Sequence, residues 1–229
     1  MILLFLAVIF FVGIHLFISG TTLRDTLVAR MGEKPYTALF SLLSFIGLGW
    51  MIWAYGRAPD IELWGQIYAW RWLSSLLILI AFLFIVLGLF TPSPTAVGGE
   101  KLLQEDEPAR GILRITRHPF LIGFAIWSCT HIVYNGDLAS LIFFSGFLIL
   151  SVLGPKSIDN KQRRSCGEVW QRFADKTSIL PFRAILQGRN RLDIKELGWW
   201  RIALALVIYI MVFKLHAMLF GVAPIVQGL

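Results

Sequence analysis

The chain has 229 residues, of which 57% are hydrophobic and 15% are charged, and its formal net charge is +7. This balance excludes an ordinary soluble domain, in which about a quarter of the residues are charged. It does not indicate nucleic-acid binding either, because the basic residues lie in loops between long apolar runs. The runs are continuously apolar, which excludes a barrel of alternating strands. We therefore expect an all-α, polytopic integral membrane protein that forms a single domain over residues 1–229.

Six apolar runs follow one another along the chain, each of a length that suits a membrane-spanning helix. The first has no basic residues before it and no small-residue cleavage site after it, so we expect a retained helix rather than a signal peptide. The fourth is short, and the turn sequence Asn135-Gly136-Asp137 predicts an antiparallel hairpin between the fourth and fifth runs. The six predicted spans cover residues 2–19, 36–55, 71–90, 118–134, 138–154 and 200–221.

Most of the 21 Lys and Arg residues lie in the first, third and fifth loops between these runs. By the positive-inside rule these loops are cytoplasmic, and both termini then lie on the non-cytoplasmic side. No Arg- and Ser-rich transit segment precedes the first run, so we expect a bacterial inner membrane protein rather than an organelle precursor. A mature plastid form would show the same pattern.

The fifth loop is predicted to contain an interfacial helix over residues 159–173. Val169, Trp170 and Phe173 fall on one face of such a helix, and many of the other positions are basic, which suits a surface of anionic headgroups. Several tryptophans lie near the predicted span ends, and we interpret them as an interfacial belt rather than a cofactor site. They are Trp50, Trp53, Trp64, Trp70, Trp72, Trp199 and Trp200.

The two cysteines indicate neither a structural disulfide nor a zinc site. Cys129 lies inside an apolar run and Cys166 lies in a basic loop, so a bridge between them is not expected. Neither belongs to a Cys-x-x-Cys pair, which is the usual spacing of zinc ligands.

The four histidines, at 15, 118, 131 and 216, all lie within or at the ends of apolar segments. Ionisable side chains are costly inside a bilayer, and a histidine there is a candidate for function. Neutral imidazole binds iron and other transition metals and also serves as an acid or a base. The alternative for each is a structural histidine that is bonded to a carbonyl group or to water.

Arg117 and His118 precede Pro119, which suits the first position of a helix at the cytoplasmic entrance. An anionic group binds readily at such a helix end, so both are candidate cofactor-binding residues, with a lipid-phosphate contact as the alternative. Depth along the spans pairs His15 with His118 and His131 with His216. One metal bridging His15 and His131 would therefore need tilted helices or a fourth span that begins deeper. For His216, beside Lys214, we favour a structural role.

Several segments carry a specific pattern: Arg-Ile-Thr-Arg-His-Pro at 114–119, Trp-x-x-x-His at 127–131, Thr-Ser-Ile-Leu-Pro-Phe at 177–182 and Gly-Arg at 188–189. Together they resemble the NnrU family, in particular its plant-type branch, the zeta-carotene isomerases. The likeness extends more loosely from Leu23 to His216, so it covers most of the chain.

The resemblance implies an integral membrane protein that binds haem b and isomerises a central cis double bond of a long apolar polyene within the lipid bilayer. It implies His15 and His131 as the two haem ligands, and hence as the metal-binding and catalytic residues. The plant-type enzymes have a cysteine directly after the tryptophan of Trp-x-x-x-His. This chain has Ser128 there and Cys129 one position later, so we do not expect a cysteine to act as an alternate ligand.

Two other functions stay open. Arg-His-Pro at a span start, followed by a hairpin and an interfacial loop, is also similar to membrane methyltransferases that use S-adenosylmethionine. Those enzymes place a Glu-Glu pair at the end of the second hairpin helix, whereas residues 150–167 here contain no glutamate. The third possibility is a non-enzymatic haem-binding or accessory protein of nitrogen-oxide respiration. The oligomeric state is not predicted.

Overall fold

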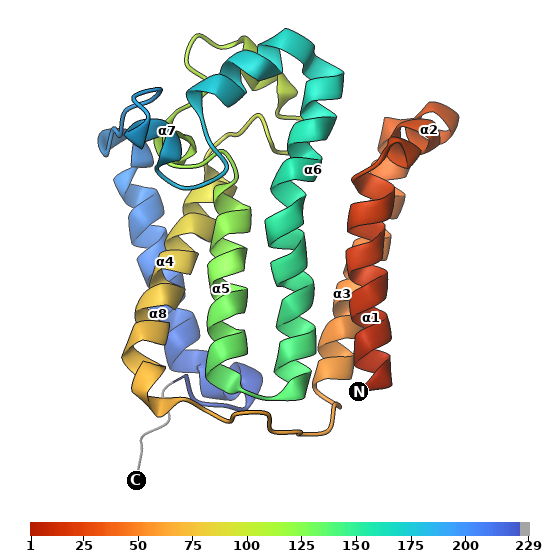
Figure 1. Ribbon diagram of the computed structural model, residues 1–229, viewed down its shortest axis with the longest axis vertical. Helices are drawn as coiled ribbons and strands as arrows, with labels where there is room; N and C mark the ends of the chain where they lie inside the picture. Colours follow the sequence, from red (N-terminus) through yellow and green to blue (C-terminus); the bar gives the residue numbers. More distant parts are fainter. Residues whose placement is uncertain (225–229) are drawn as a thin grey trace. The chain divides into compact units, whose positions relative to one another are not determined.

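A computed structural model of the chain describes residues 1–224, and most of these residues are helical, with one isolated bridge between Glu62 and Asp137 (Figure 1). The longer α-helices are α1 (Ile2–Gly13), α2 (Thr22–Met31), α3 (Glu33–Tyr55), α4 (Arg71–Phe90), α5 (Pro119–Asn135), α6 (Leu138–Lys176) and α8 (Trp199–Phe220), and α7 (Arg183–Leu186) is a single short turn. A π-helix, η1 (Ile14–Ser19), continues α1. Short 3₁₀ turns are η2 (Tyr68–Trp70), η3 (Glu100–Gln104), η4 (Gly111–Arg114) and η5 (Lys195–Leu197).

Among the described residues, five helices are long and apolar enough to cross a membrane: α1 with η1, α3, α4, α6 and α8. The predicted fourth span is α5, which has 17 residues. Tryptophans near the span ends are exposed, as an interfacial belt requires: Trp53, Trp64, Trp70, Trp72, Trp199 and Trp200. The prediction of an all-α membrane protein is therefore confirmed.

The chain forms two compact units, and α5 and α6 each contribute one part to each unit. The first unit comprises residues 1–67 and 128–157, and the second comprises residues 68–127 and 158–229.

In the first unit, α1 and α3 lie side by side (Figure 1). Small residues allow the close packing: a Cβ at Gly47 of α3 would lie 3.1 Å from the ring of Phe10, and one at Gly146 of α6 would lie 3.0 Å from Val8. Leu4 of α1 and Met51 of α3 are completely buried in this core. The unit is thus held by apolar contact between helices whose outer faces remain exposed.

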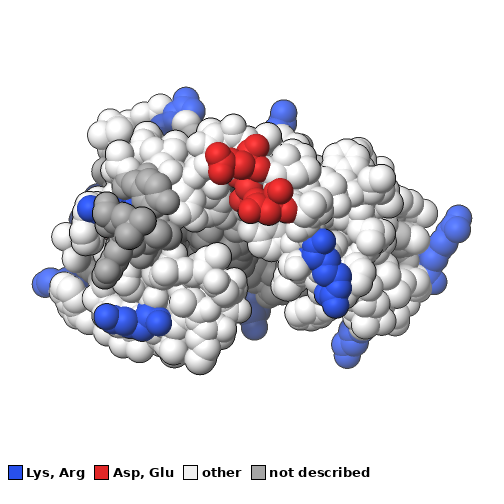
Figure 2. Space-filling view, turned by 90° about the horizontal axis from the view of Figure 1, so that it is seen from below, with Lys and Arg blue, Asp and Glu red and all other residues white. Residues whose placement is uncertain are grey.

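The turn between α5 and α6 binds the long loop that follows α3. The carbonyl oxygen of Gly136 accepts hydrogen bonds from the backbone amides of Leu63 (2.8 Å), Trp64 (3.0 Å) and Gly65 (3.2 Å). Asp137 then caps the start of α6 by accepting from the amide of Ser140 at 2.7 Å. Figure 2 shows the face on which these two loops lie, and acidic side chains gather there in one patch.

In the second unit, α4 and α8 pack side by side, and their contact continues into the loop before α5. Val86, Leu87 and Ala205 are buried together with Ile112 and Ile115 in one apolar cluster. This cluster joins the 3₁₀ turn η4 to the ends of two spanning helices. It fixes the segment from which α5 begins.

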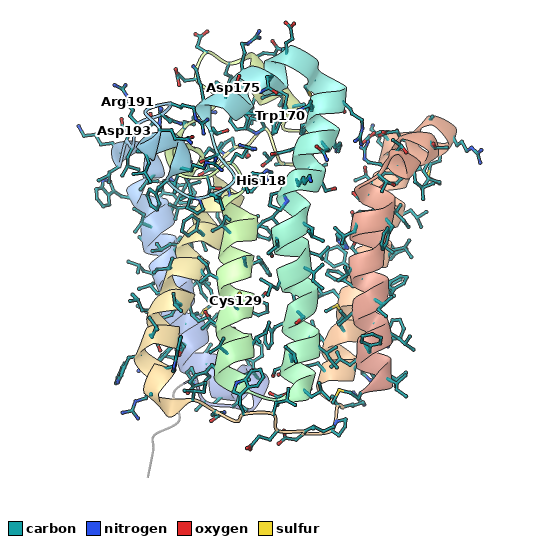
Figure 3. The ribbon with its side chains drawn as sticks, in the orientation of Figure 1. His118, Cys129, Trp170, Asp175, Arg191 and Asp193 are labelled. Atoms are coloured by element: carbon teal, nitrogen blue, oxygen red, sulfur yellow. The ribbon has the colours of Figure 1, made fainter. Side chains whose placement is uncertain are left out.

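Helix α6 differs from the prediction of a separate interfacial helix over residues 159–173. The fifth span runs on without a break to Cys166, and the only residue of α6 with non-helical torsion angles is Gly167 (φ 53°, ψ −127°). Beyond this kink, Trp170 and Phe173 are buried against Leu103 and Ala109 (Figure 3). The predicted apolar face therefore exists, and it packs on the protein.

Arg114 and Glu196 join η4 to the turn before α8. Arg114 donates from Nε to Oε2 of Glu196 (2.7 Å) and from Nη2 to Oε1 (2.8 Å), and the Gly111 amide donates to Oε2 (2.8 Å). The hydrogen bonds from Arg114 lower the pKa of Glu196 below its ordinary value of 4.5, and those to Glu196 raise the pKa of Arg114.

Replacing Gly136 with Ala is expected to destabilise the first unit strongly. Its φ is +69°, and an added Cβ would lie 2.1 Å from the Gly65 oxygen, so the loop would have to move. We expect a loss of about 3 kcal/mol in the free energy of unfolding, measured in detergent. Gly98→Ala is the matched control, because Gly98 has φ +73° and nothing within 4 Å, and it should lose only about 1 kcal/mol. Equal losses would contradict the packing argument.

The Arg114–Glu196 pair predicts a loss of stability in acid. Since the pKa of Glu196 is lowered in the folded protein, its contribution is fully present above about pH 4.5 and is lost as the pH falls through the folded pKa. Glu196→Gln should therefore reduce the difference in melting temperature between pH 7 and pH 4 relative to the unsubstituted protein. The same pH dependence in both proteins would show that this carboxyl group does not contribute.

Candidate functional site

The two segments of the sequence pattern at 114–119 and 177–182 bind each other directly. The Arg117 amide donates to the Ser178 carbonyl oxygen (2.9 Å), and the Phe182 amide donates to the Ile115 carbonyl oxygen (2.9 Å). Between them, the completely buried Thr116 donates its hydroxyl to the Ile179 carbonyl oxygen (2.7 Å). Three hydrogen bonds thus join two segments that are far apart in the chain at the start of α5.

The Gly188-Arg189 pair of the pattern closes the end of α6. Arg189 donates from Nη1 to the carbonyl oxygen of Thr177 (2.9 Å) and also to that of Asp175. Asn190 donates to the carbonyl oxygen of Lys176 (3.0 Å). The last carbonyl groups of a helix have no partner within the helix, so these side chains supply the missing donors.

Arg117 and His118 converge on one carboxylate, that of Asp159 in α6, within the second unit. His118 Nε2 lies 2.8 Å from Asp159 Oδ1, and Arg117 Nε donates to Oδ1 (3.1 Å) and Oδ2 (3.0 Å). The His118 side chain is 1% exposed and that of Asp159 is 8% exposed. Figure 3 shows His118 where α5 begins.

This geometry assigns roles within the triad. The Arg117 guanidinium balances the charge of the carboxylate, so His118 needs only to be a neutral donor from Nε2, which leaves a lone pair on Nδ1. The anion expected at the start of α5 is thus a side chain of this chain. Asp159 was not among the predicted site residues. Its signal in the sequence is a single carboxylate in the segment where a Glu-Glu pair is missing.

His15 lies in the π-helix that continues α1. Its Nδ1 lies 2.7 Å from the carbonyl oxygen of Phe11, one turn earlier, and the tautomer that donates this bond leaves the lone pair on Nε2. The ring packs between Phe11 and Phe40, with centroids 4.5 and 5.1 Å away. π-helices are rare in proteins, and those that occur are frequently found at functional sites.

His131 lies near the end of α5, in the first unit like His15. Its ring stacks on Phe144 of α6, with centroids 4.6 Å apart and an angle of 22° between the planes. Ser128 lies three residues earlier and hence on the same side of the helix. It is completely buried, and its hydroxyl has no hydrogen-bond partner among the described residues.

A series of ring contacts connects the two histidines through the first unit. His15 contacts Phe11, which contacts Phe147 (5.8 Å); Phe143 contacts Phe147 (5.3 Å) and Phe144 (5.1 Å). His131 stacks on Phe144, about one turn before Phe147, and His15 lies one turn beyond Phe11. At 1.5 Å of rise per residue, the two histidines differ in level by about 10 Å along the helices. The difference in depth expected from the spans is therefore present.

The residues around His15 and His131 are of the types that suit haem. Haem iron accepts two axial imidazoles, and a flat macrocycle needs apolar, aromatic surroundings, which Phe11, Phe40 and Phe144 provide. The buried hydroxyl of Ser128 lacks a partner that a bound group would supply. Among residues 1–224, no group of three or more His, Cys, Asp or Glu side chains could hold a metal ion. Haem binding does not require such a group, because two imidazoles are enough to hold the iron.

The remaining candidates lie elsewhere. His216 Nδ1 lies 2.7 Å from the carbonyl oxygen of Val222 at the end of α8, which fits a structural role. Cys129 is exposed, unlike its neighbour Ser128, and both cysteines are free. The structure thus brings Arg117 and His118 together in the second unit, and His15 and His131 are both in the first.

Replacing Asp159 with Asn is expected to destabilise the second unit. The Arg117 side chain, 11% exposed, would keep a charge without a counterion, a change that costs on the order of 3 kcal/mol. Thermal unfolding in detergent measures the loss. Asp175→Asn is the matched control on the same helix, because that exposed carboxylate accepts only from Gln171, and it should change stability little. Similar effects of both substitutions would argue against a structural role for the buried pair.

Comparison with known proteins supports one family across nearly the whole chain. The family model described as NnrU protein matches residues 3–224. The chain is similar to two curated proteins named 15-cis-zeta-carotene isomerase, chloroplastic. The protein from Zea mays is 28% identical over 195 residues, 82% of this chain and 51% of the relative, and the protein from Arabidopsis thaliana is 24% identical over 176 residues, 74% and 47%.

The chain spans about half the length of these relatives. No solved structure matches it. The relatives' names place them in chloroplasts, whereas a bacterial inner membrane and the orientation of the termini stay predictions for this chain. Because the family match extends over almost every described residue, the chain belongs to the NnrU family.

Proposed function

We propose that this protein is a haem-dependent cis–trans isomerase that acts on a carotenoid-like polyene within the membrane. The observation that carries the proposal is the environment of His15: a π-helical segment whose histidine is oriented by the Phe11 carbonyl group and surrounded by phenyl rings. The names of the two relatives support the reaction and the class of substrate.

His15 would hold the haem iron through Nε2. The hydrogen bond from Nδ1 to Phe11 fixes the ring orientation and increases the basicity of the other nitrogen, as carbonyl partners do for metal-bound histidines elsewhere. Phe40 contacts the ring edge-on, which limits its rotation. A preoriented imidazole needs little reorganisation to bind.

His131 would serve as the second ligand, from the part of α5 in the same unit, and a tilt of α1 or α5 would bring both histidines to one iron despite their difference in level. Its stacking on Phe144 holds the ring in one plane, and Ser128 offers a hydroxyl on the same side of the helix. Haem, when bound, would supply an iron centre that withdraws electron density from the double bond and lowers the barrier to rotation, provided that one of the two histidines leaves a position on the iron free. Arg117 and His118, the other predicted cofactor-binding residues, would act by holding the start of α5 in place through Asp159.

The phenyl rings between the two histidines would form the surface along which the substrate lies. Phe147 contacts both Phe11 and Phe143, and none of the three rings presents an ionisable group to a long hydrocarbon. A polyene gains the hydrophobic free energy of burial there without leaving any hydrogen-bonding group unpaired. This surface is apolar. An isomerase of carotenes requires an apolar surface, whereas a hydrolase does not.

Methyl transfer from S-adenosylmethionine is the second candidate, because Arg-His-Pro at a span start favours it. The carboxylate nearest to that motif, Asp159, already accepts hydrogen bonds from Arg117 and His118. A non-enzymatic haem protein is the third candidate. Incubation with labelled S-adenosylmethionine, and with a 15-cis polyene under reducing conditions, would separate the three.

Replacing either ligand is expected to abolish isomerisation and to alter the haem spectrum. Purified protein should show a Soret band, and His15→Ala and His131→Ala should each shift or weaken it and reduce turnover of a 15-cis polyene by at least about 100-fold. His216→Ala is the matched control, since that histidine lies in the second unit and bonds to the Val222 carbonyl oxygen just beyond its own helix.

Three results would refute parts of this proposal separately. Protein that never takes up haem, although correctly folded by circular dichroism, would exclude the cofactor. Normal spectra without turnover would favour the accessory protein. Full activity of both alanine variants would exclude these residues as ligands and catalytic groups.

A further inference from the structure

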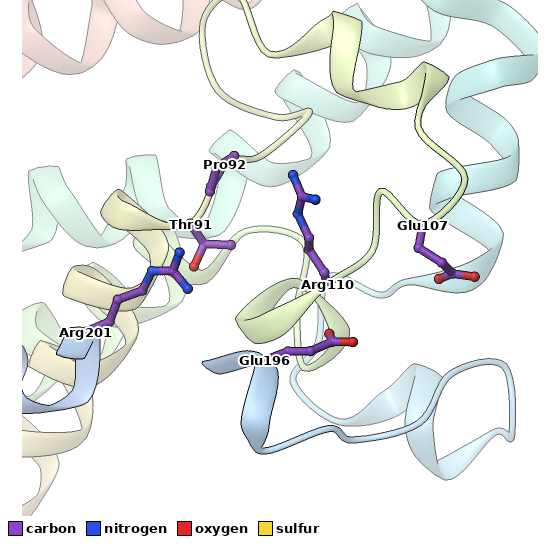
Figure 4. Close-up of a pocket in the computed structure, with 6 residues that line it drawn as sticks. All are labelled: Thr91, Pro92, Glu107, Arg110, Glu196 and Arg201. Atoms are coloured by element: carbon purple, nitrogen blue, oxygen red, sulfur yellow. The ribbon is translucent and has the colours of Figure 1, made fainter. Parts of the chain in front are cut away.

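A pocket of about 550 Å³ that several charged side chains line lies in the second unit, and it is independent of the isomerase proposal. Its lining residues come from the end of α4, the start of α8, and the loop segments beside them (Figure 4). They are Thr91, Pro92, Glu107, Arg110, Glu196 and Arg201. Charged groups on a concave surface of this size indicate a site for a small polar or ionic group.

Arg201 supplies a positive charge that has no negative partner among residues 1–224. Its recorded contacts are a long hydrogen bond to the Leu197 carbonyl oxygen (3.4 Å) and the Trp200 ring, whose centroid lies 5.0 Å from the guanidinium carbon. Its Nε is buried and has no hydrogen-bond partner among residues 1–224. A guanidinium with spare donors is the usual protein group that recognises phosphate.

Thr91 supplies a second polar group that lacks a partner. It is 5% exposed, and among the described residues its hydroxyl has no hydrogen-bond partner. The methyl group faces Gly111, where an added Cβ would lie 3.9 Å away, and Figure 4 shows the hydroxyl and the Arg201 guanidinium on the same side of the pocket. A buried hydroxyl without a partner costs free energy that a bound oxygen would recover.

The carboxylates of the pocket are already neutralised by other cations. Glu196 accepts from Arg114 through both oxygens, and Glu107 lies 3.4 Å from Lys176 and 4.0 Å from Arg114. Arg110 pairs with Glu105 (3.0 Å) on an exposed edge of the pocket. Among the described lining residues, the charge left without a counterion is that of Arg201, so the pocket favours an anion.

The position of the pocket indicates where the anion comes from. Thr91 directly follows the last residue of α4, and Arg201 lies in the first turn of α8, so the pocket is level with the ends of two spanning helices. Beside it, Phe90 contacts Trp200, and Leu89 and Trp199 are exposed. Exposed apolar side chains next to an anion site suit the acyl chains of a lipid.

We propose that this pocket binds the phosphate group of a membrane phospholipid. The Arg201 guanidinium donates to the phosphate oxygens, and the Thr91 hydroxyl donates a further hydrogen bond. The acyl chains lie along the exposed apolar side chains of α4 and α8. The lipid thereby joins the end of α4 to the start of α8.

Native mass spectrometry of the full chain in detergent, titrated with phosphatidylglycerol, tests this site. Arg201→Gln should weaken binding at least about 10-fold, because it removes a charge-assisted interaction. Thr91→Val, which keeps the shape of the side chain, should weaken binding about threefold or more and raise the melting temperature of the lipid-free protein. Arg57→Gln is the matched control, since Arg57 also lies over a tryptophan ring (4.6 Å) but outside the pocket, and it should bind as the unsubstituted protein does.

Two further probes separate the sources of the anion. Digalactosyldiacylglycerol with the same acyl chains carries no phosphate and should bind at least about 10-fold more weakly. Glycerol 3-phosphate carries the phosphate without the chains and should compete only at far higher concentrations. Equal affinity for the galactolipid, or unchanged binding by both pocket variants, would overturn the proposal. Equal affinity for glycerol 3-phosphate would overturn its assignment to a lipid.

Discussion

Burial of one carboxylate organises the second unit. Asp159 is almost inaccessible, and a charge in such a place persists only where cations and donors surround it. Arg117 and His118 supply these from the residues just before α5, and the backbone of the same segment bonds to residues 178–182. A single ionic contact therefore sets where α5 begins, where α6 passes, and how the loop after α6 returns. The 3₁₀ turn η4 and the Arg114–Glu196 pair extend the same network to the start of α8.

Much of the fold followed from hydropathy, because a spanning helix records its length and its apolar character locally. The predicted runs correspond to α1 with η1, α3, α4, α5, the first part of α6, and α8. The hairpin at Gly136 was also predictable, because the sequence Asn135-Gly136-Asp137 is typical of a turn. The kink at Gly167 was not, because the helix before it continues through a polar sequence for reasons of tertiary packing: Gln162 is buried and donates to the Pro94 carbonyl oxygen (3.0 Å).

The residues of the candidate site were likewise predictable only in part. Residue types pointed to His15, His118 and His131, but no pattern in the chain distinguished a histidine that binds a carboxylate from one that lies among phenyl rings. His118 proved to be the first kind, and His15 and His131 the second. Asp159, Thr91 and Arg201 could not be predicted as site residues from the sequence. Their roles depend on burial, and the residues that bury them come from distant segments of the chain.

The π-helix at the end of α1 has a consequence for how such a helix tolerates change. A π segment is an α-helix into which one extra residue has been fitted, and the surplus is absorbed within about one turn. The residues on either side of Ile14–Ser19 can therefore point toward α3 and α6 in the same way with or without the extra residue. The number of positions between the histidine and the first basic loop is thus free to vary by one without rotating either partner, so spacing alone is a poor guide to this histidine.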